Sequence, residues 1–331
     1  MQISINALRE LTKKAILHYG YTEAEAVTIL EVLLYAQLRG NNQGVVKLTG
    51  AGIPKSPQAK APTTEKETKV SALMNAHGTH AMIAINLAVD TLVAKAKEHG
   101  IAVVGVNHIT SSSGALGYYA KRVAEAGLVG FVFAGSMESV AVHGSFEAML
   151  GTNPLAIGVP SEGDPLVLDM ATAAMAYYGV VEANIAGREL PPNIAFDKNG
   201  KPTTQPKDVL DGGALRAFDQ NKKGSGLSMM VQALTGPLTN SYFTGIGDVT
   251  SNWGGHLLLA FDPEILGGLE AVRQGVSQMI GKVKSSKKVD GVEEIFAPGE
   301  RGNRMAAEAV AANSIVIEDN LYQALKKVTN E

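Results

Sequence analysis

The middle of the chain alternates twice between a helical pattern and a short apolar run, with a glycine before or at each apolar run. Short apolar runs bounded by glycine and rich in valine are typical of buried strands. Strands that alternate with helices form a sheet covered by helices. The pattern therefore predicts a mixed α/β sheet, with helices over 80–98 and 118–125 and strands over 101–106 and 128–134.

Two helical patterns fill the first forty residues. Apolar side chains recur at helical spacing from Ile5 to Ile16. Thr22 and Glu25 have the spacing of a capping box, which predicts the start of a second helix. Beyond these helices, the segment 50–69 is rich in proline, threonine and lysine and predicts an exposed loop.

The second half of the chain predicts a less regular succession of elements. The segment 227–234 is mostly apolar and ends at Gly236-Pro237, so we expect a buried helix there. The other expected elements are a hairpin of 155–159 and 166–168, a strand over 257–261, a helix over 265–284, a short strand over 314–317 and a terminal helix over 321–328.

Composition excludes several classes of protein. The chain has no cysteine, which excludes thiolate chemistry, disulfides and thiolate metal sites, and no His, Asp and Glu cluster has metal-ligand spacing. The net charge of -3 gives no reason to expect nucleic acid or an anionic membrane as a partner. No apolar run is long enough for a membrane span, and the first residues lack the basic and apolar segments of a signal peptide. We therefore expect a cytoplasmic enzyme or binding protein.

Four short motifs combine glycine or alanine with hydrogen-bonding side chains near the expected element ends. Turns of this kind suit a site that grips a polar ligand with backbone groups. No Gly-x-Gly-x-x-Gly follows a strand and no phosphate-binding P-loop sequence occurs. The four motifs cover Leu150 to Pro154, Leu168 to Thr172, Lys223 to Gly226, and Gly254 to Pro263.

Together and in this order, the motifs resemble the type-2 malate/L-lactate dehydrogenase family, whose members are NAD(P)-dependent and unrelated to ordinary lactate dehydrogenases. The resemblance covers most of the chain and is clearest over 101–263. It implies the family's α/β fold with a non-Rossmann NAD(P) site, and a homodimer. It also implies an N-terminal helical part (1–75) that packs with a C-terminal helical part (263–331), around a central cofactor-binding domain (76–262).

The resemblance further implies where the cofactor, NAD or NADP, is held. Lys223 precedes a helix start, where backbone N–H groups suit a phosphate, although a solvated lysine is the alternative. Arg301 and Arg304 follow a Pro-Gly-Glu element like the family's, with a surface ion pair as the alternative. The implied cofactor-binding residues are Thr152, Asn153, Asp169, Met170, Ala171, Lys223, Gly224, Arg301 and Arg304.

The chain departs from the family at two catalytic positions. After Leu-Arg-Gly the family has a histidine and then an arginine, whereas this chain has Gln43 and Lys47. Glutamine hydrogen-bonds but does not titrate near neutral pH, and lysine keeps the charge but loses the bidentate fork. We expect Gln43 to orient the substrate and Lys47 to hold its carboxylate. At the second position Ser112 replaces a histidine, and His108 is a candidate to substitute for it.

His143 stands in a segment that resembles the branch of the family that reduces Δ1-piperideine-2-carboxylate and Δ1-pyrroline-2-carboxylate. We expect His143 to line the site, with a structural histidine as the alternative. A ketimine can arrive already protonated, so losing the acid histidine costs less on an imine than on a ketone. This favours a ketimine reductase acting on a small 2-imino or 2-oxo carboxylate. The alternatives are a dehydrogenase of malate, lactate or ureidoglycolate, and a non-catalytic descendant that binds a nucleotide or metabolite.

Overall fold

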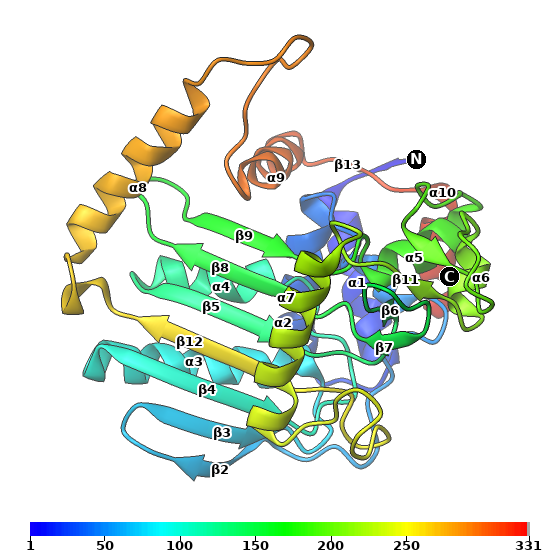
Figure 1. Ribbon diagram of the computed structural model, residues 1–331, viewed down its shortest axis with the longest axis horizontal. Coiled ribbons are helices and arrows are strands. Elements are labelled where there is room, and N and C mark those ends of the chain that lie inside the picture. Colours follow the sequence, from blue (N-terminus) through cyan, green and yellow to red (C-terminus); the bar gives the residue numbers. More distant parts are fainter. Residues whose placement is uncertain (330–331) are drawn as a thin grey trace.

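The computed structural model describes residues 1–329, so the last two residues of the third predicted part lie outside it (Figure 1). Its centre is a seven-stranded mixed sheet in the order β2-β3-β4-β12-β5-β8-β9. Only β3 and β4 run parallel, and the other neighbours are antiparallel. The mixed α/β sheet and the β8–β9 hairpin are therefore as predicted. The strands are β2 Thr63–Glu67, β3 Ser71–Asn75, β4 Ile101–Asn107, β5 Val129–Ala134, β8 Leu155–Val159, β9 Leu166–Met170 and β12 His256–Phe261.

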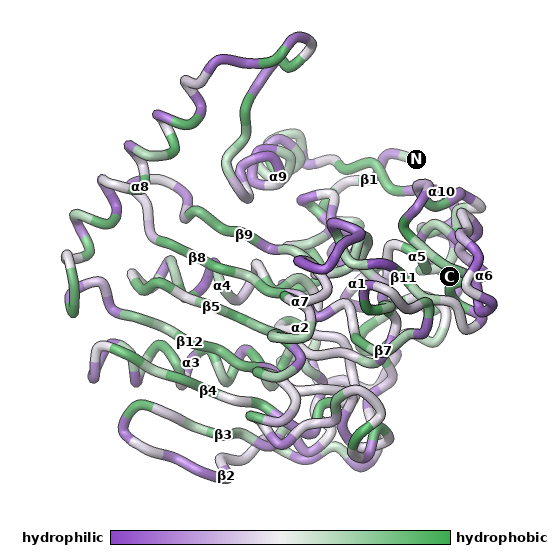
Figure 2. The backbone as a smooth tube through the Cα atoms, viewed as in Figure 1, coloured by the Kyte–Doolittle hydropathy of each residue, from purple (hydrophilic) through white to green (hydrophobic). Residues whose placement is uncertain are grey.

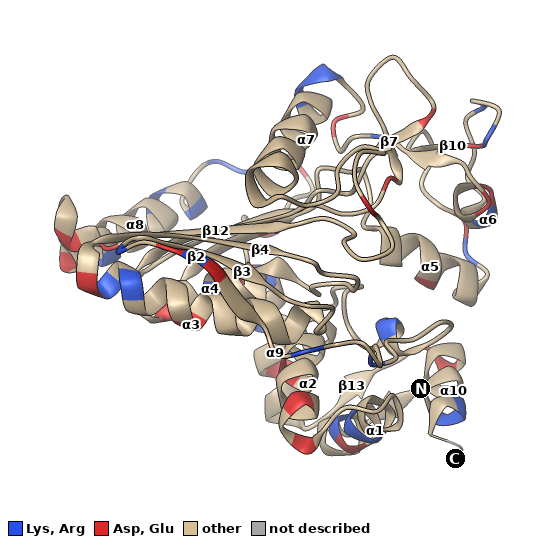
Figure 3. Ribbon diagram, turned by 90° about the horizontal axis from the view of Figure 1, so that it is seen from below, with Lys and Arg blue, Asp and Glu red and all other residues tan. Residues whose placement is uncertain are grey.

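The two faces of this sheet are covered to very different extents. Helices α3 (Ala81–His99) and α4 (Leu116–Glu125) cover one face, where Val104, Val132 and Leu258 are completely buried. On the other face lies α7 (Lys222–Thr235), which crosses the strands near their ends (Figure 1). Seen edge-on, α7 lies on one side of the sheet and α3 and α4 lie on the other (Figure 3).

The expectation that the apolar segment 227–234 is buried is wrong. Its small and polar side chains pack inward, whereas Met229 and Met230 are 56% and 60% exposed. The physical reason is a set of buried hydrogen bonds: Asn153 Nδ2 donates to the Ser228 carbonyl oxygen at 3.1 Å and to Gln232 Oε1 at 2.8 Å. Those bonds fix the polar face of α7 toward the sheet, so its methionines face outward.

The two ends of the chain pack together, as expected. Helix α1 (Ile5–His18) contacts α10 (Asp319–Val328), and α2 (Glu23–Leu38) contacts α9 (Glu300–Ala312). Strand β1 (Gln2–Ile3) pairs antiparallel with β13 (Ile315–Val316). The predicted capping box starts α2, where Thr22 Oγ1 accepts from the Glu25 backbone N–H and Glu25 Oε2 accepts from the Thr22 N–H.

The segment 50–69 is only partly a loop, because β2 forms the edge of the sheet within it. All five residues of β2 are exposed and hydrophilic, in contrast to the apolar central strands (Figure 2). Backbone pairing with β3 holds this strand, and backbone pairing leaves no apolar pattern in the sequence. Since β2 and β3 belong to the central sheet, the sheet crosses the predicted boundary at residue 75, and the domain limits stay a prediction.

A smaller unit of four short strands lies beside the main sheet and has a second apolar core. Helix α8 buries none of its residues and stands beyond the ends of β8 and β9, beside the turn that joins them (Figure 1). Within residues 1–329, no helix is both long enough and apolar enough to cross a membrane. The remaining elements are β6 Val140–Ala141, β7 Ala148–Leu150, β10 Ala195–Phe196, β11 Ala214–Leu215, α5 Tyr177–Ala186, α6 Pro206–Leu210, α8 Leu269–Lys284, η1 Val45–Leu48, η2 Pro237–Thr239 and η3 Pro263–Ile265.

Candidate active site

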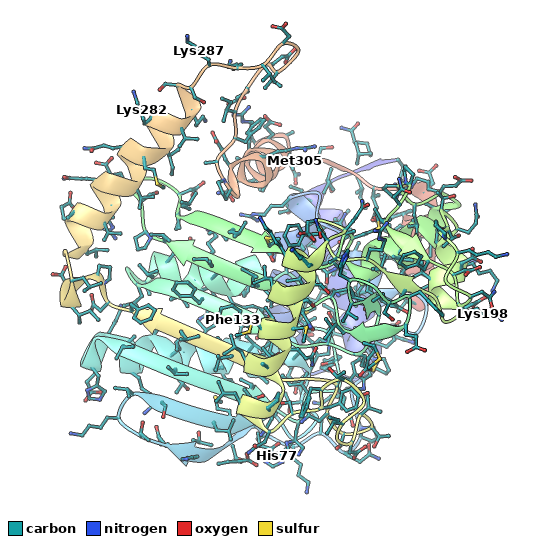
Figure 4. All side chains as sticks on the ribbon, viewed as in Figure 1. His77, Phe133, Lys198, Lys282, Lys287 and Met305 are labelled. Carbon is teal, nitrogen blue, oxygen red and sulfur yellow. The ribbon has the colours of Figure 1, made fainter. Side chains whose placement is uncertain are left out.

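Two cavities meet beside the end of α2 and the loop that follows β4. The first, of about 670 Å³, lies between that loop, the end of β9 and the start of α9, where Met305 (Figure 4) forms part of its wall. The second, of about 340 Å³, lies at the ends of β4 and β5 and the start of β12. Both are lined by Gln43, Gly114, Thr152 and Pro154. Ligands in the two cavities would therefore touch at this junction.

The first cavity carries two cations on its wall. The Arg39 guanidinium lies 3.7 Å from the centre of the Tyr35 ring, and its Nε and Nη2 each donate to Asn303 Oδ1 at 3.2 Å. Arg301, on the first turn of α9, is exposed at the rim. Neither arginine forms an ion pair with a carboxylate in residues 1–329. An anionic ligand would thus find two arginines here that are not engaged in an ion pair.

Asp169, at the end of β9, lines the same cavity. Its Oδ2 accepts from the Gly117 backbone N–H at 2.8 Å, and burial raises the pKa of its carboxyl to about 6. Glycine at 117 favours this close approach, because a Cβ there would lie 3.0 Å from the Asp169 Cβ and Oδ2, which is tighter than an ordinary contact. Of the predicted cofactor-binding residues, the structure brings Asp169 together with Thr152, Met170, Ala171 and Arg301 in the first cavity.

Asn153 lies beneath this cavity rather than on its wall. It is completely buried in a left-handed conformation (φ 36°), and its amide is occupied by the hydrogen bonds to α7. Its Oδ1 also accepts from the Ser136 backbone N–H at 3.4 Å. Asn153 therefore shapes the turn that presents Thr152, whose own N–H donates to Ser136 Oγ at 3.0 Å.

The structure does not bring Lys223, Gly224 and Arg304 to either cavity. At the start of α7, Asp219 Oδ2 already accepts from the Gly224 backbone N–H at 3.0 Å, so a carboxylate occupies the place expected for a phosphate. Lys223 is exposed beside it. The Arg304 guanidinium donates to both oxygens of Glu294 at 2.6 and 2.7 Å, which makes it a surface ion pair.

The second cavity has hydroxyl and aromatic groups on its wall and a cation behind it. Ser112 lines the cavity, whereas Lys47 is 1% exposed and lines neither cavity. Lys47 Nζ donates to Ser112 Oγ at 2.6 Å and lies 3.4 Å from the centre of the Tyr178 ring. Burial lowers the pKa of Lys47 well below its usual range. The predicted pair of Gln43 and Lys47 thus flanks the cavity, with only Gln43 on its surface.

Histidines occupy three different environments around this site. His256, at the start of β12, lines the second cavity; burial lowers its pKa to about 3, and neither ring nitrogen has a hydrogen-bond partner within the described chain. His143 is exposed in a separate cavity of about 290 Å³. The expectation that it lines the same site as Gln43 is therefore wrong. His108 lines neither of the two adjoining cavities, and its Nδ1 is 2.9 Å from Asn107 Oδ1.

Several wall residues had not been singled out from the sequence. Arg39 had a detectable signal, because it belongs to the intact Leu38-Arg39-Gly40 motif. The aromatic residues had no local signal, since they reach the cavity from distant elements. The wall residues that sequence reasoning missed include Asn41, Asn42, Met175, Phe218 and Met305 in the first cavity and Tyr177, Tyr178 and Trp253 in the second.

Comparisons with known proteins agree on one family. The profile of the malate/L-lactate dehydrogenase family matches residues 3–326. Ureidoglycolate dehydrogenase (NAD(+)) of Escherichia coli O157:H7 is 31% identical over 98% of this chain and 95% of that protein. The Δ1-pyrroline-2-carboxylate/Δ1-piperideine-2-carboxylate reductase of Pseudomonas putida is 32% identical over 99% and 97%. The malate dehydrogenase structure from Entamoeba histolytica shares the fold, with a TM-score of 0.90 and 23% identity over 100% of this chain and 98% of that one. The chain therefore belongs to the malate/L-lactate dehydrogenase family.

Proposed function

We propose that the chain is an NAD(P)-dependent oxidoreductase that transfers a hydride to C2 of a small 2-imino or 2-oxo carboxylate, with cyclic 2-imino acids favoured. One observation carries the proposal: a large cavity with cationic walls opens onto a smaller, hydroxyl-lined cavity at Gln43 and Thr152. A hydride transfer needs two ligands held in contact, one of them a dinucleotide. The paired cavities provide for both.

The first cavity fits a dinucleotide. Its volume of about 670 Å³ lies within the ordinary range for cofactor sites. Arg39 and Arg301 would hold the diphosphate, since neither forms an ion pair with a carboxylate in residues 1–329. Thr152, Met170 and Ala171 would hold the part nearest the junction. When bound, NAD(P) supplies or accepts the hydride.

The second cavity fits a small carboxylate. At about 340 Å³ it admits a short-chain or five- to six-membered cyclic acid more readily than a large ligand. Gln43, at the junction, would orient the substrate through its amide. Lys47 would attract the carboxylate into the cavity with its positive charge, because its Nζ lies one side chain behind the wall.

Substrate choice follows from the missing histidine acid. Reduction of a ketone develops negative charge on oxygen, which requires a proton or strong electrostatic stabilisation. A cyclic imine that arrives protonated becomes a neutral amine on receiving the hydride, so it requires neither. Since Gln43 does not titrate, imino acids are the favoured substrates. A 2-hydroxy-acid dehydrogenase is the second candidate, favoured by the contact of Lys47 with Ser112, which puts a titratable group beside the cavity.

We also propose a homodimer, which would cover the sheet face that α7 leaves open. Phe131 and Phe133 lie on that face and are only half-buried, and Phe133 is labelled in Figure 4. Met229 and Met230 of α7 are exposed. Helix α8 has an apolar stripe along Val272, Val276 and Met279, yet it buries no residue. Large exposed apolar areas usually mark interfaces, and a second copy of the chain is the occupant that fits. Sedimentation that shows only monomer at micromolar concentration would contradict this.

The proposed function is tested by binding and turnover in one series. The purified protein is titrated with NADH and NADPH, and a panel of 2-oxo acids and cyclic 2-imino acids is then assayed for oxidation of the cofactor that binds. We expect one cofactor to bind and at least one cyclic 2-imino acid to be reduced. Binding without turnover would indicate a non-catalytic descendant, and no binding of either cofactor would overturn the proposal.

A further inference from the structure

We propose that Ser112 and Lys47 form a proton relay, in which Ser112 Oγ gives its proton to the C2 oxygen of a 2-oxo acid and takes one from Lys47 Nζ. The inference rests on the proposed function and supplies the acid that Gln43 cannot. It also assigns Lys47 a chemical role beyond attracting a carboxylate.

The geometry leaves Ser112 one direction in which to donate. Its Oγ accepts from Lys47 Nζ at 2.6 Å and from the Gly114 backbone N–H at 3.3 Å. A hydroxyl has two acceptor lone pairs and one hydrogen, so with both lone pairs engaged the O–H remains as a donor. No acceptor in residues 1–329 takes it, and Ser112 lines the second cavity. A substrate oxygen there would receive that hydrogen.

The surroundings of Lys47 suit a proton source better than a structural ion. Helices α1, α2, α5 and α10 pack around η1 and bury the side chain. No carboxylate in the described chain pairs with it, and burying an unpaired ammonium is costly. Tyr178, under its Nζ, and His80, at the start of α3, are the titratable groups that interact with it. Burial and the charge of Lys47 lower the pKa of His80 to about 3, so His80 stays neutral.

Burial and a substrate carboxylate shift the protonation of the Lys47 amine in opposite directions. Burial lowers the pKa of its amine well below the usual range, which makes Nζ–H a better acid than an exposed lysine. A substrate carboxylate arriving in the adjoining cavity favours the charged amine and so raises that pKa again. A bound substrate carboxylate would therefore favour the protonated form of Lys47, which is the form that donates.

The step balances in atoms and charge. C2 receives the hydride and forms a C–H bond, while the electron pair of the C=O π bond moves to oxygen. That oxygen takes the Ser112 Oγ proton as Ser112 Oγ takes one from Lys47 Nζ, which leaves a neutral amine. Water restores the Lys47 proton after the hydroxy acid leaves. In the oxidation direction every transfer is reversed.

The test compares two reactions of one enzyme. In Ser112→Ala and in Lys47→Met, kcat for a 2-oxo acid should fall about 100- to 10,000-fold, the usual contribution of general acid catalysis. The double variant should lose no more than either single variant, because the two residues act as a unit. Reduction of a protonated cyclic imino acid, and cofactor affinity, should change far less. Ser225→Ala is the matched control, since this buried α7 serine lines neither cavity.

A charge-preserving variant separates the relay from simple attraction. Lys47→Arg keeps the positive charge but does not titrate near neutral pH, so KM should be retained while kcat for the 2-oxo acid falls. The wild type should also lose 2-oxo acid reduction at high pH, as Lys47 loses its proton, and Lys47→Arg should lack that dependence. This pH profile keeps the test open if Lys47→Met or Ser112→Ala fails to fold.

Several outcomes would overturn the relay. Lys47→Arg with unchanged kcat would show that only its charge matters. An equal loss of the oxo and imino reactions in Ser112→Ala would indicate a role in binding alone. A wild type that reduces imino acids but no 2-oxo acid would also contradict it. If the wild type binds no NAD(P), the proposed function fails instead, and the two failures are thereby distinguished.

Discussion

The two adjoining cavities place their positive charges differently. In the first, Arg39 and Arg301 stand on the wall itself, where they meet a ligand directly. In the second, the cation is Lys47, buried one side chain behind Ser112. Arginine keeps its charge in any protein environment, whereas a buried lysine readily changes its protonation state. The difference indicates that the first cavity is built to bind an anion and the second to move a proton.

The largest expected effect tests this comparison by transferring the role of proton donor from Ser112 to residue 43. In a Ser112→Ala background, Gln43→His should raise kcat for 2-oxo acids by at least about 100-fold, since a histidine at the junction replaces the lost donor. The imino acid reaction should respond little. In the wild-type background the same substitution should add much less, because the relay already donates. Equal gains in both backgrounds would mean that Ser112 donates nothing.

The loss of folding stability at low pH should come mainly from two buried histidines, His80 and His256. Burial lowers the pKa values of His80 and His256 to about 3, against about 6.5 in the unfolded chain. Below pH 6.5 the unfolded state binds more protons, so stability falls as the pH falls toward 3. At pH 5 each histidine should cost about 2 kcal/mol of unfolding free energy. Urea unfolding of the wild type and His256→Asn at pH 7 and 5 measures this, and an identical pH dependence would contradict it.

Cofactor affinity should depend on the wall cations of the first cavity. Arg39→Gln should weaken cofactor binding by roughly 10- to 100-fold, the usual worth of a charge-assisted contact, with kcat at saturating cofactor nearly unchanged. Arg304→Gln is the control, because this arginine pairs with Glu294 outside the cavity. Fluorescence titration with the preferred cofactor measures both variants. Equal weakening in the two would argue against the Arg39 assignment.

The smallest expected effect concerns Asp169. Its contribution to stability changes with pH in the direction opposite to that of the two histidines. Its pKa is raised to about 6, so the folded state binds its proton more tightly and loses stability as the pH rises from about 4 to 6. Asp169→Asn keeps an acceptor for the Gly117 N–H and should stabilise the fold by about 1–3 kcal/mol at pH 7. At pH 4 the gain should nearly vanish. If Asp169→Asn instead loses stability at pH 7, the charged carboxylate of Asp169 is stabilised by its surroundings and the prediction is wrong.

Helices and strands were predictable where the local sequence carries an apolar pattern or a capping motif. The central strands follow from apolar runs, and the start of α2 follows from Thr22 and Glu25. Strand β2 was not predictable, because its five residues are all exposed and are held by backbone pairing with β3 and by polar contacts such as that of Asn75 with Glu65. The orientation of α7 was predicted wrongly, since the hydrogen bonds of Asn153 outweigh the preference of Met229 and Met230 for burial.

For the candidate site, the resemblance to the family singled out Gln43, Ser112 and Thr152, and all three line the second cavity. Lys223 and Arg304 could not be placed from sequence. Asp219 fills the start of α7 and Glu294 pairs with Arg304, and the sequence does not reveal either contact. The position of Lys47 behind Ser112 also depends on tertiary packing, although its residue type had already drawn attention.

The central claim is that two reactants meet at Gln43, Gly114 and Thr152. The most direct measurement is a crystal structure with the oxidised cofactor and an unreactive cyclic 2-carboxylate. We predict the diphosphate beside Arg39 and Arg301, the reactive ring at the junction, and the carboxylate in the second cavity, with C2 of the ligand facing Ser112. A cofactor bound outside the first cavity, or a ligand whose C2 lies away from Ser112, would contradict the account.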